Sequence, residues 1–171
     1  MKRLTLIRHA KSSWDESGLA DFERPLNERG KRDAPEMGRR LAAIDASPDL
    51  MLASTAKRAR STAKRIASEI GYPKVEIVFE QLFYGATAGE MFDAIRRLKS
   101  ELSEVIIVSH NPGITDLNNT LCDTHIDNIP TCGVVRLELP VSGWDATEPG
   151  CARMVDFDYP KRKHPAAPSS D

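Results

Sequence analysis

Strand-like and helix-like segments alternate along most of this chain, and that alternation restricts the folds open to it. Short apolar runs typical of buried strands lie at Leu4–Ile7, Leu50–Ala53, Val75–Phe79 and Glu104–Val108. The segments between them carry apolar residues three and four positions apart, as in helices with one buried face: Ala34, Met37, Leu41 and Ile44; Ala59, Ala63, Ile66 and Ile70; Met91, Ile95, Leu98 and Leu102. This order predicts an α/β layered fold with a mostly parallel central sheet.

The length of 171 residues suits one domain. Two further strand-like segments, 133–139 and 151–159, follow the alternating part of the chain. From residue 160 onward, Lys, Arg, Pro and Ser dominate, a composition typical of a solvated terminus. We therefore predict a single domain over residues 1–159 and a flexible basic tail over residues 160–171.

Several helix boundaries carry recognisable end signals. The Thr87–Glu90 run is a capping box for the third helix. Asn111 followed by Pro112 predicts an N-cap and a first-turn proline for the fourth helix. Asn27 is a candidate N-cap for the first helix, but Pro35 then falls inside it, so we expect a kink or a later start.

Charge and hydropathy exclude some classes of partner. The chain has 24 basic and 25 acidic residues and a net charge of -1, so it has no overall field that attracts nucleic acid or an anionic membrane. No apolar run approaches the ~18 residues of a membrane span. The apolar stretch near the N-terminus, Leu4–Ile7, is too short for a signal-peptide core, so we expect a cytoplasmic protein.

The cysteine pattern suggests neither disulfides nor zinc. There are three cysteines, an odd number, at Cys122, Cys132 and Cys151. Their spacing with His125 matches no standard zinc motif. We predict ordinary reduced thiols and no metal ion.

Basic residues follow three of the predicted strands at the point where each strand ends. Arg8 and His9 follow the first strand, Arg58 lies in the first turn after the second, and His110 follows the fourth. The carboxyl ends of parallel strands share one edge of a sheet, where α/β proteins place their functional crevice. Two helix N-termini add positive partial charge at that edge. We therefore predict a cationic pocket that binds a phosphoryl group.

Each of these features has an ordinary structural alternative when it is taken alone. A histidine at a strand end is often a structural residue, and Arg58 could be one of several solvated arginines and lysines on its helix. The run Ser109–Gly113 could be only a turn and a helix cap. Their occurrence together, at the same place relative to three strands, favours the pocket.

Five longer motifs stand out in the chain, and three of them contain these residues. In chain order they are Arg8-His9-Ala10, Asp21-x-x-Arg24-Pro25-Leu26-Asn27-Glu28-Arg29-Gly30, Ser54-x-x-x-Arg58-Ala59-x-x-Thr62-Ala63, Leu82-Phe83-Tyr84-Gly85-Ala86 and Ser109-His110-Asn111-Pro112-Gly113. With these motifs the chain resembles the histidine phosphatase superfamily, which includes the cofactor-dependent phosphoglycerate mutases, and within it the SixA-type phosphohistidine phosphatases. The resemblance covers about residues 3–159. It implies a phosphoglycerate mutase-like, three-layer αβα sandwich.

The resemblance also implies a role for each site residue. His9 would be the nucleophile that becomes phosphorylated, and Arg8, Arg58 and His110 would complete the phosphate pocket. No metal or other cofactor is implied. The acidic proton donor of mutase-like relatives has only one counterpart here, Glu80, and its local spacing differs. Glu80 is thus a candidate general acid, with a solvated strand-end residue as the alternative.

The chemistry of the leaving group and the size of the chain suggest a substrate. An alkyl phosphate needs a general acid, whereas phosphohistidine releases a ring nitrogen that can already carry its proton. The chain also has no long insertion that could cover the pocket, which favours a phosphorylated side chain on another protein. We predict a metal-independent phosphatase acting on phosphohistidine in a protein, for example a histidine phosphotransfer protein. The alternatives are a phosphomonoesterase or mutase for a small phosphorylated metabolite, and a non-catalytic phosphate-binding module.

Overall fold

The computed structural model describes residues 1–164, and within them the chain forms a six-stranded sheet in the order β3-β2-β4-β1-β5-β6. The strands are β1 Lys2–Arg8, β2 Leu50–Ser54, β3 Val78–Glu80, β4 Glu104–Ser109, β5 Val134–Leu139 and β6 Arg153–Asp158. The pairs β2–β3, β2–β4 and β1–β4 are parallel, whereas β1–β5 and β5–β6 are antiparallel. The prediction of a mostly parallel sheet is confirmed.

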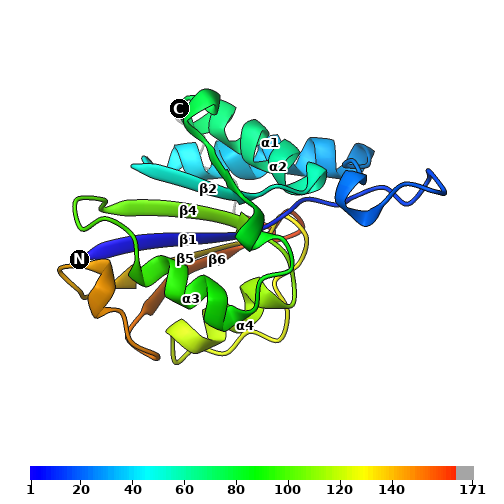
Figure 1. The fold of residues 1–171 in the computed structure, drawn as a ribbon. Helices are drawn as coiled ribbons and strands as arrows, with labels where there is room; N and C mark the ends of the chain where they lie inside the picture. The colour runs from blue at the N-terminus through cyan, green and yellow to red at the C-terminus, as the bar shows by residue number, and fades with distance from the viewer. Residues whose placement is uncertain (165–171) are drawn as a thin grey trace, which may run out of the picture.

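Helices cover both faces of the sheet (Figure 1). On one face lie α1 (Glu28–Ala43) and α2 (Lys57–Ile70), and on the other lie α3 (Ala88–Arg96) and α4 (Gly113–Leu121). The three-layer αβα sandwich is therefore also confirmed.

Alternate residues of the central strands supply two separate cores. In β1, Leu4 and Leu6 belong to the apolar cluster that includes residues of α3 and α4, while Ile7 belongs to the cluster that includes residues of α1 and α2. All three side chains are fully buried. Because both faces are covered, the central strands are apolar at nearly every position, which explains why they are recognisable in the sequence.

The third strand begins later than the sequence suggests. Residues Lys74–Glu76 form a short 3-10 helix, and the side chain of Val75 is 94% exposed. Only Ile77 in this apolar run is buried, and β3 starts after it, at Val78. The prediction of a strand from Val75 is therefore wrong, because β-branched composition alone does not distinguish a strand from an exposed turn.

The helix-end signals are confirmed in part. The side chains of Thr87 and Asn27 accept hydrogen bonds from the backbone N–H groups of Glu90 and Gly30, so both are N-caps. Helix α1 starts at Glu28 and continues through Pro35, so a later start is wrong. The buried face of α1 outweighs the cost of an interior proline, about 3 kcal/mol.

The predicted cap at Asn111 is wrong. Helix α4 starts at Gly113, with Pro112 in the N-cap position. The Asn111 side chain instead accepts a hydrogen bond from Thr115 Oγ1 (2.6 Å) and donates one to the carbonyl of Ile129 (3.0 Å). It thereby ties the start of α4 to the loop that precedes β5.

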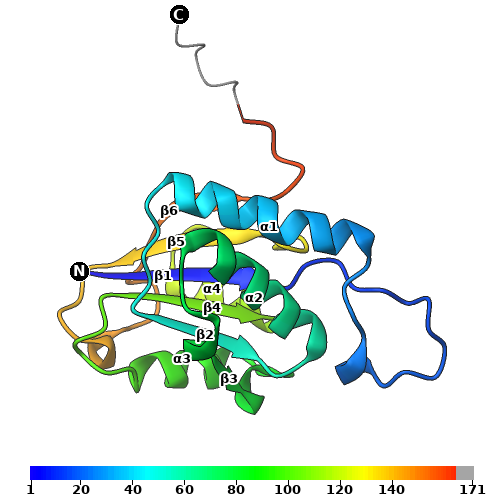
Figure 2. The same cartoon turned by 90° about the horizontal axis from the view of Figure 1, so that it is seen from above.

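Two segments lie at the periphery of the domain, one between β1 and α1 and one near the C-terminus. The segment between β1 and α1 projects beyond the carboxyl edge of the sheet (Figure 2). Near the C-terminus, Arg40 donates a hydrogen bond to the carbonyl of Pro160, and His164 lies 2.9 Å from Asp158. Residues 165–171 of the predicted tail lie outside the described residues. No helix in the described part of the chain has the length and apolarity needed to cross a membrane.

Candidate active site

His9 lies directly after β1, with its ring held in one protonation form. Its backbone N–H donates a hydrogen bond to the carbonyl of Ser109, at the end of β4 (3.0 Å). The ring Nδ1 lies 2.7 Å from the carbonyl oxygen of Ala10. A carbonyl only accepts hydrogen bonds, so Nδ1 carries the proton and Nε2 keeps its lone pair. This arrangement leaves Nε2 as the nucleophilic atom of a buried imidazole.

A buried hydroxyl links this strand end to the start of α2. The backbone N–H of Ala10 donates to Thr62 Oγ1 (3.0 Å), and the Thr62 hydroxyl donates to the carbonyl of Arg58 (2.7 Å). Thr62 is fully buried, so these bonds are shielded from water. They fix the first turn of α2, which carries Arg58, relative to the backbone that carries His9.

His110 brings the end of β4 to the same place. The centroids of the His9 and His110 rings are 5.0 Å apart. His110 Nε2 lies 2.7 Å from the hydroxyl of Ser54, the last residue of β2. His110 Nδ1 is buried and has no hydrogen-bond partner among the described residues. The ends of β1, β2 and β4 therefore converge, as the sequence predicts.

Two arginines complete the cluster. Arg8 is anchored by a hydrogen bond from Nη1 to the carbonyl of Ile129 (3.0 Å). Arg58 is buried, and its Nη1 and Nη2 donate to the carbonyl (2.7 Å) and the carboxylate (2.9 Å) of Asp21. These bonds use two of the five N–H groups of Arg58 and leave three for another acceptor. The structure thus brings the four predicted residues Arg8, His9, Arg58 and His110 to one edge of the sheet.

Asp21 is a site residue that the sequence reasoning missed. It lies in a short 3-10 helix, Asp21–Glu23, between β1 and α1. Its Oδ2 accepts hydrogen bonds from Arg58 (2.9 Å) and Tyr84 (2.8 Å), and its Oδ1 accepts one from Arg24 (3.1 Å). The signal was present, because Asp21, Arg24 and Tyr84 belong to the motifs quoted above, but nothing in the sequence shows that these motifs meet.

Arg24 holds together the segment that carries Asp21. Besides its bond to Asp21, it donates from Nε to the carbonyl of Ser13 (3.1 Å) and from Nη2 to the hydroxyl of Ser12 (2.5 Å). Its guanidinium carbon lies 3.2 Å from the centroid of the Trp14 ring, which is 74% exposed. The segment between β1 and α1 is therefore organised around one buried arginine.

The environment keeps both histidines neutral. Burial is the main cause that lowers the pKa of His9 to about 3, with further lowering by His110 and by the positive charges of Arg58 and Arg8. Burial, followed by the charge of Arg58, lowers the pKa of His110 to about 4. At neutral pH both rings are uncharged, so His9 is available as a nucleophile. His110 is then a neutral hydrogen-bonding group in the free protein.

These shifts predict a loss of stability in mild acid. The unfolded chain binds a proton at each histidine near pH 6.5, whereas the folded chain does so only near pH 3 to 4. Stability is therefore lost as the pH falls below 6.5. We expect the free energy of unfolding to fall by about 2 kcal/mol per histidine between pH 7 and pH 5. Urea unfolding at the two pH values measures this difference. In His9→Gln the difference in the free energy of unfolding between the two pH values should be smaller by about the contribution of one histidine. Equal stability of the parent protein at both pH values would contradict the lowered pKa values of the two histidines.

Glu80 lies one strand away from the cluster. It ends β3 and pairs in register with Ser54, whose hydroxyl contacts His110. The Glu80 residue is exposed. The structure thus places Glu80 near the cluster and leaves its role as a general acid a prediction.

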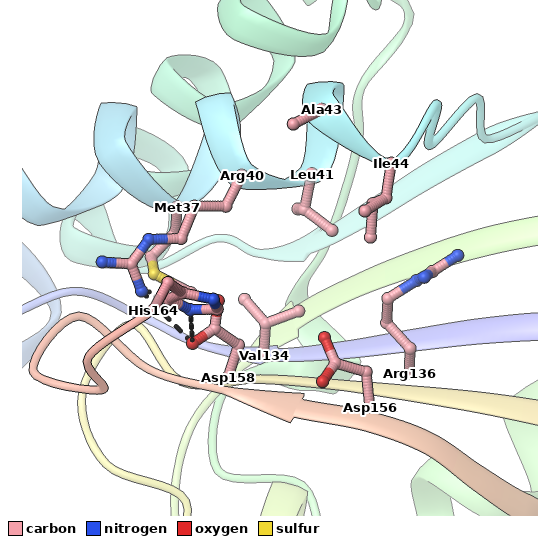
Figure 3. A pocket seen from close by; sticks show the side chains of 10 residues that line it. All are labelled: Met37, Arg40, Leu41, Ala43, Ile44, Val134, Arg136, Asp156, Asp158 and His164. Atoms are coloured by element: carbon pink, nitrogen blue, oxygen red, sulfur yellow. Dashed lines mark hydrogen bonds and ion pairs between the residues drawn. The ribbon is translucent and has the colours of Figure 1, made fainter. Parts of the chain in front are cut away.

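A separate pocket of about 200 Å³ lies between α1 and the strands β5 and β6 (Figure 3). Its walls combine apolar side chains such as Leu41 and Val134 with the ion pair between Arg40 and Asp158 (3.2 Å). None of the four predicted site residues lines it. The imidazole that lines it, His164, is paired with the carboxylate of Asp158 (2.9 Å), so we assign the phosphate site to the strand ends.

Side chains that could bind a metal ion are dispersed in the described part of the chain. The described part of the chain has no group of three or more His, Cys, Asp or Glu side chains placed to hold a metal ion. Cys122, Cys132 and Cys151 are free thiols, of which the first two are buried. The chemistry supported by the cluster at the strand ends is therefore that of a neutral imidazole nucleophile beside cations that bind a phosphoryl group.

Comparisons with known proteins agree with this geometry. Residues 4–98 match the family model of the histidine phosphatase superfamily, branch 1. An uncharacterized protein of Mycobacterium tuberculosis is 30% identical over 165 residues, which cover 91% of this chain and 100% of that protein. A 2,3-bisphosphoglycerate-dependent phosphoglycerate mutase of Brucella abortus is 30% identical over 92 residues, or 53% of this chain and 45% of the mutase.

A solved structure has the same fold over nearly the whole chain. The structure from Agrobacterium tumefaciens, assigned as a phosphohistidine phosphatase SixA, superposes with a TM-score of 0.80 at 28% identity and covers 93% of this chain and 98% of that one. A mycobacterial glucosyl-3-phosphoglycerate phosphatase shares the fold at 14% identity, with a TM-score of 0.67 and coverage of 90% and 97%. The chain belongs to the histidine phosphatase superfamily and is similar over nearly its whole length to a SixA-type phosphatase of that superfamily.

Proposed function

We propose that this protein removes the phosphoryl group from phosphohistidine in another protein, through a phosphorylated His9. The observation that carries the proposal is the His9 ring, which is neutral, oriented by Ala10 and surrounded by Arg8, Arg58 and His110. A fixed imidazole lone pair beside preorganised cations is what phosphoryl transfer requires.

The reaction proceeds in two displacements at phosphorus. In the first, the Nε2 lone pair of His9 forms a bond to phosphorus, and the bond between phosphorus and the substrate imidazole breaks. The electron pair of that bond stays on the substrate nitrogen, and the dephosphorylated protein leaves. In the second, water attacks phosphorus, the His9–phosphorus bond breaks, and inorganic phosphate is released with the proton lost by water. Arg8 and Arg58 stabilise the charge on the phosphoryl oxygens in both steps.

A phosphohistidine substrate is supported by the leaving group. The reactive form of phosphohistidine carries a proton on the ring nitrogen that is not bonded to phosphorus, so the imidazole leaves as a neutral molecule. Such a substrate needs no strong general acid. The resemblance to the Agrobacterium tumefaciens structure supports the same substrate class. We also propose that the protein acts in the cytoplasm on a phosphorylated protein and has no nucleic acid or membrane partner.

The second candidate function is hydrolysis of a small phosphorylated metabolite in the same pocket. The superfamily relatives that support it are the Brucella abortus mutase and the mycobacterial glucosyl-3-phosphoglycerate phosphatase. To separate the two functions, kcat/KM should be compared on a phosphohistidine protein and on a panel of sugar phosphates and phosphoglycerates. We expect a preference for phosphohistidine, and a strong preference for the small esters would overturn the proposal.

Trapping the intermediate separates both enzymes from a non-catalytic phosphate-binding module. Brief incubation with a phosphorus-labelled substrate should leave a label on the protein that survives base and is lost in acid, as a phosphoramidate is. A protein that binds phosphate but acquires no such label would be a binding module.

Substitution of Glu80 tests whether the leaving group needs an acid. We expect Glu80→Gln to change kcat/KM on phosphohistidine by less than about threefold and on alkyl phosphates by about tenfold or more, because only the alkoxide requires a proton. Steady-state kinetics on both substrates measure the effect, with Glu76→Gln, an exposed residue of the preceding 3-10 helix, as the matched control. Large and equal losses on both substrates would make Glu80 a general acid for both reactions.

A further inference from the structure

We propose that Asp21 determines substrate specificity by accepting a hydrogen bond from the protonated ring of the phosphohistidine leaving group. This inference rests on the function proposed above and adds a residue that distinguishes phosphohistidine from phosphate esters. It is carried by the position of the Asp21 carboxylate, its unused hydrogen-bonding capacity and the charge of the groups around it.

The position of Asp21 supports this role. The nucleophile His9 is only 8% exposed and therefore lies at the bottom of the site. In an in-line displacement the leaving group departs on the side of phosphorus opposite the nucleophile, which here is the open side. The Asp21 side chain is 50% exposed, yet it contacts Arg58 at 2.9 Å. It therefore lies between the phosphate-binding arginine and the solvent through which the leaving group departs.

The Asp21 carboxylate also has unused hydrogen-bonding capacity. The two oxygens of a carboxylate accept about four hydrogen bonds. Oδ2 of Asp21 accepts from Arg58 and Tyr84, whereas Oδ1 accepts only from Arg24 among the described residues. Oδ1 therefore retains room for one more donor. The three existing bonds hold the carboxylate rigidly, so it can accept that donor without rearranging.

The negative charge of Asp21 has the sign that suits a phosphohistidine leaving group. A phosphohistidine ring that is ready to leave is positive, and a carboxylate nearby stabilises that charge. The oxygen of a departing alcohol or phenol instead gains negative charge, which the same carboxylate disfavours. One fixed negative charge at this position thus favours the P–N substrate and disfavours the P–O substrate.

The surroundings of Asp21 keep its carboxylate ionised. Partial burial acts to raise its pKa, but hydrogen bonds from Tyr84, Arg58 and Arg24 lower it to about 2. His110 also faces this group, and the Asp21 charge acts to raise the pKa of that ring. At neutral pH the residue is a hydrogen-bond acceptor and not a proton donor.

The test is the nearly isosteric variant Asp21→Asn. We expect the ratio of kcat/KM on a phosphohistidine peptide to kcat/KM on p-nitrophenyl phosphate to fall by about tenfold or more. The pH profile of kcat on the phosphohistidine peptide gives a second readout. Its basic limb reports the protonation of the bound substrate ring, and in the variant it should move to lower pH by about one unit.

Two further variants control for the structural role of Asp21. Asp21→Glu keeps the negative charge and should retain most of the substrate preference. Glu23→Gln removes a negative charge from an exposed residue of the same 3-10 helix and should leave the ratio unchanged. Thermal unfolding of each variant verifies that it is folded.

The outcomes separate this inference from the proposed function. A parent protein that turns over phosphohistidine, together with an Asp21→Asn variant that loses equally on both substrates and keeps its pH profile, would show that Asp21 only positions Arg58. A variant with unchanged kinetics would also overturn the inference. A parent protein that hydrolyses p-nitrophenyl phosphate but not phosphohistidine would overturn the proposed function and this inference with it.

Discussion

His9→Ala is expected to abolish turnover on every phosphorylated substrate, because the variant lacks the atom that forms the bond to phosphorus. The cations Arg8 and Arg58 remain, and their anchors at Ile129 and Asp21 do not involve the His9 ring. The variant should therefore still bind an oxyanion such as tungstate. Steady-state kinetics measure the first expectation, and calorimetric titration with tungstate measures the second.

The matched control for this variant is His125→Ala, which removes an exposed imidazole from a loop after α4. It should retain full activity. Turnover by His9→Ala close to that of the parent protein would remove His9 from the role of nucleophile, and loss of tungstate binding would indicate that the substitution disturbs the pocket itself.

Arg58→Ala is expected to lower kcat/KM by about 100-fold or more, by analogy with the removal of one preorganised donor from an oxyanion site. Arg58 is buried, and three of its N–H groups remain available to phosphoryl oxygens. Because its charge also lowers the pKa of His110, the pKa of that histidine should rise in the variant. Kinetics and an NMR titration of the His110 ring measure the two effects.

The control for Arg58 lies two residues away on the same helix. Arg60 is exposed, and its guanidinium carbon lies 4.4 Å from the centroid of the Phe79 ring. Arg60→Ala should therefore leave kcat/KM unchanged. Arg58→Lys keeps a positive charge but loses the planar fork, so we expect it to restore only part of the activity. An Arg58→Ala variant within about twofold of the parent protein would show that this arginine does not bind the transferred group.

The convergence of the four site residues could be predicted because it depends on regular structure. Arg8 ends β1, and His9 and His110 directly follow β1 and β4. Strands buried on both faces are recognisable as apolar runs. Parallel neighbours then bring their carboxyl ends to one edge. Arg58 joins them because a helix begins three residues after β2 ends. The convergence of these residues therefore does not depend on the details of side-chain packing.

The contacts of Asp21 could not be predicted in the same way. They depend on the path of the segment between β1 and α1, which has little regular structure. The side chain that organises this segment, Arg24, reaches across 11 residues to Ser13. Neither spacing nor periodicity encodes such a contact. Local sequence propensity also misplaced the start of β3 and the cap of α4. The exposure of Val75 keeps it out of β3, and the Asn111 side chain bonds to the loop before β5 instead of capping α4.

The dependence of the segment between β1 and α1 on Arg24 has a consequence for how relatives of this enzyme can diverge. Residues near Trp14 that do not contact Arg24 do not determine the geometry of the catalytic cluster. The backbone that carries the nucleophile His9 is held by hydrogen bonds to the end of β4 and to Thr62. Mutations can accumulate at these positions and reshape the surface that meets a partner protein while the rate of the chemical step is preserved. Recognition and chemistry can therefore evolve at different speeds within one small domain.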